Sequence, residues 1–212
     1  MVARDWYNED MIPLKELPPN YQLHSTFNLS TKKAVLVLNL IGFFLLLFFG
    51  WLFIGLAKAM RPDFTRIGII ISSVFSLLVP LVVLLLMILL HEVIHGLFFW
   101  LYTHQRPIFA FKGAYAYAAA PDWYLPRNKY VVVGLSPLIL ISLAGLLLLT
   151  IAPLSFFPSI LIVMIFNAAG AVGDLIVVGW LLLQQPDSLV RDYGDMFTVY
   201  QPVTVYSQEI PG

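Results

Sequence analysis

Residues 78–102 read LVPLVVLLLMILLHEVIHGLFFWLY, an apolar stretch that carries His91, Glu92 and His95 near its middle. A helix rises about 1.5 Å per residue, and about 20 apolar residues are enough to cross the hydrocarbon core of a bilayer. Ionisable side chains are costly at membrane depth and indicate a functional site there. The stretch therefore predicts a membrane helix that carries a site.

The composition of the whole chain supports a membrane protein. Of 212 residues, 60% are hydrophobic and 11% are charged, whereas soluble chains are about half apolar and about a quarter charged. Lys+Arg and Asp+Glu balance at 12 each, which gives no electrostatic reason to expect nucleic acid as a partner. Cys is absent, which excludes disulfides and cysteine metal sites. We predict that the chain's partner is the lipid bilayer.

Four apolar stretches are long enough to cross the bilayer. They are residues 34–57, 78–102, 130–151 and 159–183. Before the second stretch, residues 67–77 are also apolar, and Pro80 separates them from the helix that follows. We treat residues 67–77 as an extension of the second helix, with a separate crossing as the alternative.

A short hairpin is predicted between the second and third helices. Residues 107–120 hold two short runs around a turn at Lys112-Gly113, which is typical of paired β-strands. The ends of the chain, residues 1–33 and 184–212, are read as polar tails. The predicted fold is an all-α membrane protein with about four transmembrane helices and a β-hairpin loop, in one domain over residues 1–212.

The basic residues outside the spans predict the orientation, because Lys and Arg are enriched on the cytoplasmic side. With the N-terminus inside, nine basic residues lie in inner segments and three in outer segments. The inner residues are Arg4, Lys15, Lys32, Lys33, Arg106, Lys112, Arg127, Lys129 and Arg191, and the outer residues are Lys58, Arg61 and Arg66. Both termini and the hairpin are therefore expected in the cytoplasm.

The segment His91-Glu92-Val93-Ile94-His95 matches the pattern H-E-x-x-H. Residues four apart share one face of a helix, so the two imidazoles can bind one Zn²⁺ while Glu92 serves as general base. A chance cluster is disfavoured, because without a metal ion the polar atoms of two histidines and a glutamate would lack hydrogen-bond partners in lipid. The pattern predicts a catalytic zinc site.

A catalytic zinc usually takes a third protein ligand, and the candidates are Asp174, Asp122 and His104. Asp174 is preferred because it lies about nine residues from the cytoplasmic end of its span, and His91 lies about eleven from the end of its own, so their depths agree. No Lys or Arg lies within the spans to pair with Asp174. Asp122 and His104 fall in the loop and remain alternatives.

Asn167 lies seven residues before Asp174, close to the same helix face. Its amide is a candidate catalytic group that binds the substrate backbone or the developing oxyanion, and an interhelical hydrogen bond is an equal alternative. Ala169 and Gly173 form a small-xxx-small pair, which allows two membrane helices to approach closely.

These residues resemble those of two related groups of proteins. The segment His91–Gly96, together with Asn167 and Asp174, resembles site-2-type intramembrane zinc proteases, in which a later aspartate completes the metal site. Over about residues 20–200 the order of motifs is more similar to the small prokaryotic zincin peptidases of unknown function, including Ser136-Pro137 and Gly173-Asp174. The resemblance implies zinc, peptidase activity and a prokaryotic cell membrane. Gly170 and Leu175 depart from the site-2 pattern, as does the spacing of Asn167 from Asp174.

The predicted function is zinc-dependent hydrolysis of a peptide bond in a membrane or membrane-associated protein. The substrate is expected to bind in extended form against the 107–120 hairpin by strand addition. One alternative is a zinc hydrolase that acts on a lipid-linked substrate, because the same site chemistry permits it. Another is a zinc-binding membrane scaffold or regulator without catalytic activity.

Overall fold

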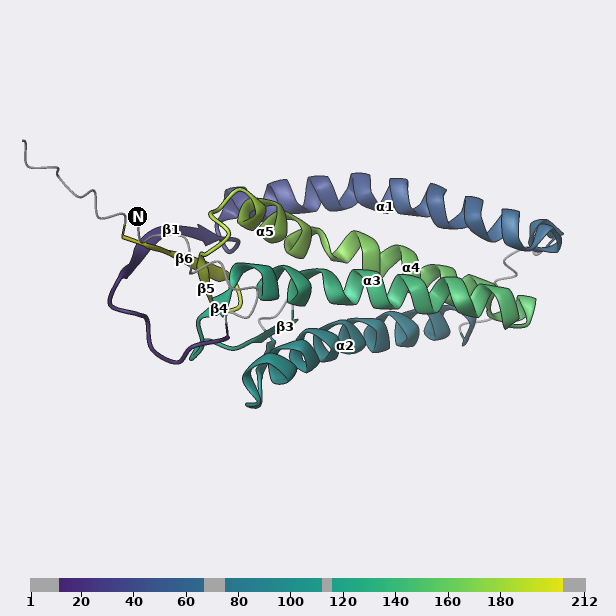
Figure 1. The fold of residues 1–212 in the computed structure, drawn as a ribbon. Coiled ribbons are helices and arrows are strands. Elements are labelled where there is room, and N and C mark those ends of the chain that lie inside the picture. Colours follow the sequence, from purple (N-terminus) through teal and green to yellow (C-terminus); the bar gives the residue numbers. More distant parts are fainter. Residues whose placement is uncertain (1–11, 67–74, 112–115, 204–212) are drawn as a thin grey trace, which may run out of the picture.

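The computed structural model describes residues 12–66, 75–111 and 116–203, and these form a helical bundle with a small sheet at one end (Figure 1). The helices are α1 Lys32–Met60, α2 Phe75–Thr103, α3 Arg127–Ile151, α4 Phe157–Gly170 and α5 Val172–Leu182. Two 3₁₀ turns, Pro62–Arg66 and Leu154–Phe156, lie at the far end of the bundle. An extension of α2 or a separate crossing was predicted for residues 67–77; residues 75–77 belong to α2, and residues 67–74 lie outside the described residues.

Among the described residues, three helices are long and apolar enough to cross a membrane, and a fourth span results if α4 and α5 count together. The predicted apolar helices at 34–57, 78–102 and 130–151 are confirmed as α1, α2 and α3. The stretch predicted as one helix at 159–183 bends by 42° at Ala171. The bend falls among small residues, where helices can approach each other closely. Membrane crossing itself stays a prediction.

Two apolar clusters hold the helices together. At the far end, Phe53 of α1, Leu149 of α3 and Phe157 of α4 belong to one buried cluster. At the sheet end, Phe99 of α2 and Tyr130 of α3 pack with residues of the sheet. Large apolar side chains also cover the outer faces of α1 and α2, where many are exposed. An apolar surface of this kind is compatible with contact to lipid chains, which offer no hydrogen-bond partners to polar side chains.

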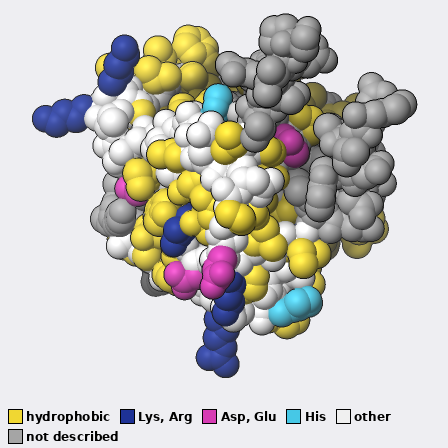
Figure 2. Space-filling view, turned by 60° about the vertical axis from the view of Figure 1, so that its left-hand side comes forward, with side chains coloured by type: hydrophobic (Ala, Val, Ile, Leu, Met, Phe, Trp, Pro, Cys, Tyr) yellow, Lys and Arg dark blue, Asp and Glu magenta, His cyan; other side chains and the backbone are white. Residues whose placement is uncertain are grey.

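The two predicted tails contain β-strands, so the all-α description is incomplete. The sheet has the antiparallel order β1-β6-β5-β4, with β1 Tyr21–Asn28, β4 Leu125–Pro126, β5 Leu189–Asp192 and β6 Met196–Pro202. Polar residues in β1 and β6 obscure these strands in the sequence, but pairing of the chain's two ends satisfies their backbone groups. Figure 2 looks toward this end, where charged side chains lie among apolar ones.

The two paired strands of the predicted hairpin are confirmed as β2 Ile108–Phe111 and β3 Ala116–Ala119, and the predicted turn at Lys112-Gly113 lies outside the described residues. The two strands fold back along α2, and Phe109 of β2 lies directly against Gly96, where a Cβ atom would overlap the ring. The absence of a side chain at Gly96 therefore lets the hairpin approach α2 one residue after His95.

Candidate metal centre

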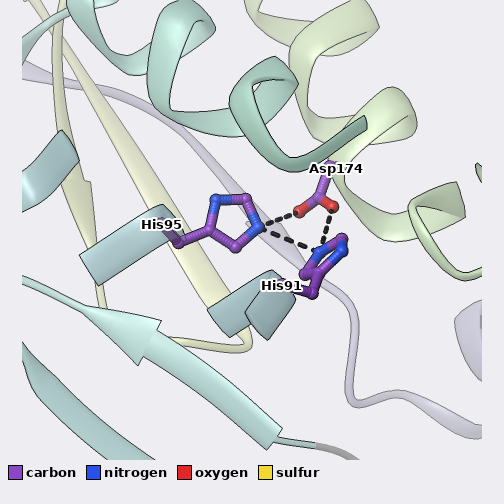
Figure 3. A group of neighbouring side chains, drawn as sticks. All are labelled: His91, His95 and Asp174. Atoms are coloured by element: carbon purple, nitrogen blue, oxygen red, sulfur yellow. Dashed lines mark hydrogen bonds and ion pairs between the residues drawn. The ribbon is translucent and has the colours of Figure 1, made fainter. Parts of the chain in front are cut away.

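His91 and His95 of α2 meet Asp174 of α5 inside the bundle (Figure 3). The Nε2 atoms of the two histidines are 3.2 Å apart. The Asp174 carboxylate lies 3.2 Å from Nε2 of His91 and 3.4 Å from Nε2 of His95. The bend at Ala171 places Asp174 in the first turn of α5, so a residue far along the chain completes the group.

The second nitrogen of each histidine is already engaged. Nδ1 of His95 donates to the backbone carbonyl of Val133 at 3.0 Å. Nδ1 of His91 lies 2.9 Å from Oδ1 of Asn167. The Asn167 amide donates through Nδ2 to the Pro137 carbonyl at 3.3 Å, which fixes its oxygen toward His91. Both histidines therefore donate through Nδ1, and in the neutral rings both Nε2 atoms carry the lone pairs that a metal ion could take.

The donor set fits a zinc ion. Nε2 of each histidine and the Asp174 carboxylate converge on one point. When both imidazoles are neutral with Nδ1–H, all three groups are acceptors, and a cation between them satisfies all three. Ligands held about 2.0–2.1 Å from a tetrahedral zinc lie roughly 3.3–3.4 Å from one another. The three separations of 3.2, 3.2 and 3.4 Å agree with this spacing. Hydrogen bonds from metal-binding histidines to carbonyl groups are typical supports of such sites.

The other candidates for a third ligand lie elsewhere. His104 is exposed at the end of α2, with a positive φ of 52°. Asp122 is exposed in the turn that follows β3. Neither belongs to the metal-binding group found among the described residues.

Asn167 is 1% exposed and is held between His91 and the Pro137 carbonyl. These contacts are the interhelical hydrogen bonds that were the predicted alternative to a catalytic role for Asn167. In this arrangement, Asn167 orients a ligand and does not border the cavity at the site.

Glu92 lies beside the two histidines and is held by the hairpin. The backbone N–H of Ala118 donates a hydrogen bond to its carboxylate. Among the described residues, β3 pairs with β2 alone, so its other edge has no strand partner, and residues 116–118 line the cavity beside the metal group. Backbone groups of alternate residues point to the same edge of a strand, so Ala116 presents its N–H and C=O along this edge.

A cavity of about 380 Å³ opens beside the metal group. Its lining includes Glu92, Asp174 and β3 residues 116–118, with Leu38 and Asn39 of α1 on another side. The volume lies within the range of small-molecule sites, about 300–1,000 Å³. A short extended segment of a chain could therefore reach the metal group, with most of the contacts made by apolar residues.

A family model described as "Putative zincin peptidase" matches residues 84–190, which is half of the chain. The chain belongs to this family. The resemblance to the zincin peptidases is thereby confirmed, and the matched segment contains both histidines, Glu92 and Asp174. No curated protein and no solved structure matches the chain.

Several features of the site were not predicted from the sequence. The Val133 carbonyl, which binds His95, is a backbone group and has no signal of its own in the sequence. The one indication is Pro137, four residues later, which has no N–H to donate to this carbonyl. Asp192 of β5 also borders the cavity, where it accepts hydrogen bonds from the Tyr130 hydroxyl and the Gly194 N–H, both at 2.6 Å. Burial raises the pKa of the Asp192 carboxyl to about 6. The hydrogen bond between Tyr130 of α3 and Asp192 of β5 connects the sheet to α3 next to the site.

Proposed function

We propose that this protein is a membrane-embedded zinc peptidase that hydrolyses a peptide bond of a membrane or membrane-associated protein. The observation that carries the proposal is the convergence of ligand atoms from His91, His95 and Asp174 beside the Glu92 carboxylate, on the wall of one cavity. Family membership supports peptidase chemistry, and the apolar helices support a location in the membrane.

The residues divide the chemistry between them. His91, His95 and Asp174 would hold the zinc ion, which when bound supplies Lewis-acid chemistry that lowers the pKa of water and polarises a peptide carbonyl. Glu92 takes the proton from the attacking water and delivers it to the leaving amine. The hydrogen bond from Ala118 holds the Glu92 carboxylate between the cavity and the histidines.

The outer edge of β3 is the proposed binding surface for the substrate. A peptide that adds to this edge would be extended, with its carbonyls released from helical hydrogen bonds. Ala116 lies on the edge, and Ala118 on the same edge already binds Glu92. A strand at this position would pass the general base, which favours an unwound segment of a protein as the substrate.

The test is a comparison of membrane fractions from cells that express the wild-type chain or Glu92→Gln. Proteomics that also records new N-termini should find at least one membrane protein that is cut only with the wild-type chain. A change confined to lipids would favour the lipid-linked alternative. No difference in protein or lipid would favour a scaffold without catalytic activity.

Gly96→Leu should separate the hairpin from the metal site. The larger side chain would displace Phe109 and with it β3, so the hydrogen bond from Ala118 to Glu92 would be lost. Misplacement of about 1 Å can cost ~10²-fold in rate, and we expect a loss of about that size in cleavage of the substrate, with zinc content unchanged. Gly55→Leu is the control, since nothing lies within 4 Å of a Cβ there. Wild-type cleavage by Gly96→Leu would contradict the proposed role of the hairpin.

Both termini are proposed to lie in the cytoplasm. The pairing of β1 with β6 supports their location at one end of the bundle, and the basic residues of the loops favour that end as the inner one. Since the chain has no cysteine, Asp122→Cys and Asp63→Cys can report on the two ends. A thiol reagent that does not cross membranes should label Asp63→Cys on intact cells, and Asp122→Cys only after lysis. The reverse pattern would overturn the orientation.

A further inference from the structure

Pro137 interrupts the hydrogen bonding of α3 at the level of the metal group. In a regular helix, the carbonyl of residue 133 accepts a hydrogen bond from the N–H of residue 137. Proline has no N–H, so the Val133 carbonyl lacks that partner. It accepts instead from Nδ1 of His95 at 3.0 Å and from the Ser136 hydroxyl at 2.8 Å.

We propose that Pro137 is a positioning residue for the metal ligands, because it leaves the Val133 carbonyl free to fix the ring and the tautomer of His95. The inference rests on the proposed zinc site. A carbonyl oxygen has two lone pairs, and His95 and Ser136 occupy both. An N–H at position 137 would be a third donor and would compete directly with His95.

The same turn of α3 also supports the other histidine. The carbonyl of Pro137 accepts from Asn167, and the oxygen of Asn167 faces Nδ1 of His91. Val133, Pro137 and Asn167 are nearly fully buried, so water does not replace these contacts. One interrupted helix turn thus orients His95 directly and His91 through Asn167, and both Nε2 atoms are left for the metal.

The test measures the zinc affinity of the purified full-length protein by competition with a chelator. Loss of a supporting group typically weakens metal binding by about 10–100-fold, and we expect a loss in this range for Pro137→Ala. The double variant Ser136→Ala/Pro137→Ala should recover most of the affinity, since removal of the hydroxyl returns one lone pair to His95. Pro80→Ala is the matched control, a proline in α2 about three turns before His91, and should bind zinc as the wild type does.

Wild-type affinity in Pro137→Ala would overturn the inference. So would an equal loss in the single and double variants, because helix shape and not the lone pairs would then be responsible. Absence of zinc binding by the wild-type chain would instead overturn the proposed function. If Pro137→Ala did not fold, nitrogen NMR of histidine in the wild-type protein would decide. His95 should be the Nδ1–H tautomer, and the Nε2–H tautomer would refute the inference.

Discussion

Glu92→Gln is expected to keep zinc and the fold while substrate cleavage falls by about 10²–10⁴-fold. General acid–base catalysis contributes an effect of this size, and glutamine retains the shape of the side chain without the basic carboxylate. Glu92 is not one of the three residues that meet at the metal group, so zinc content should not change. The measurement is the rate of cleavage of a substrate identified by proteomics, with zinc determined on the same sample.

The control is Glu16→Gln, the same change at an exposed residue in the N-terminal segment. It should cleave at the wild-type rate. Near-wild-type cleavage by Glu92→Gln would show that the carboxylate serves only to bind the hairpin through Ala118.

Asp174→Ala is expected to remove zinc almost completely. The carboxylate is the one ligand from α5, and without it the two histidines of α2 would hold the ion alone. Since loss of a supporting residue costs about 10–100-fold in metal affinity, loss of a ligand should cost more than about 100-fold. Zinc per chain after purification, together with chelator competition, measures the effect.

Asp122→Ala and His104→Ala are the matched controls, because the sequence named both residues as alternative ligands and both are exposed in the structure. They should retain wild-type zinc. If either lost zinc while Asp174→Ala kept it, the metal centre between α2 and α5 would be incorrect.

The long apolar helices and the H-E-x-x-H segment were predictable because both signals are local. Each of α1, α2 and α3 contains a long run of mostly apolar residues, and the spacing of His91 and His95 is a property of one helix. Asp174 was the preferred third ligand from its depth and from the lack of a cation in the spans. The distances now place it beside both histidines.

The sheet and the supports of the site could not be predicted in this way. β1 pairs with β6 near the other end of the chain, and each strand alone has a mixed, partly polar pattern. The role of Asn167 was undecided because its helix face suits either a substrate contact or a bond to a neighbouring helix. The contact of His95 with the Val133 carbonyl depends on how α2 packs on α3, which the sequence of neither helix specifies.

X-ray absorption at the zinc edge of the purified wild-type protein tests the metal centre most directly. A centre formed by His91, His95 and Asp174 should contain about one zinc per chain, with two imidazole nitrogens and a carboxylate oxygen at about 2.0–2.2 Å. The imidazole signal should fall in His95→Ala, and the oxygen contribution should change in Asp174→Ala. Zinc well below one per chain, or a coordination shell without two imidazoles, would contradict the account.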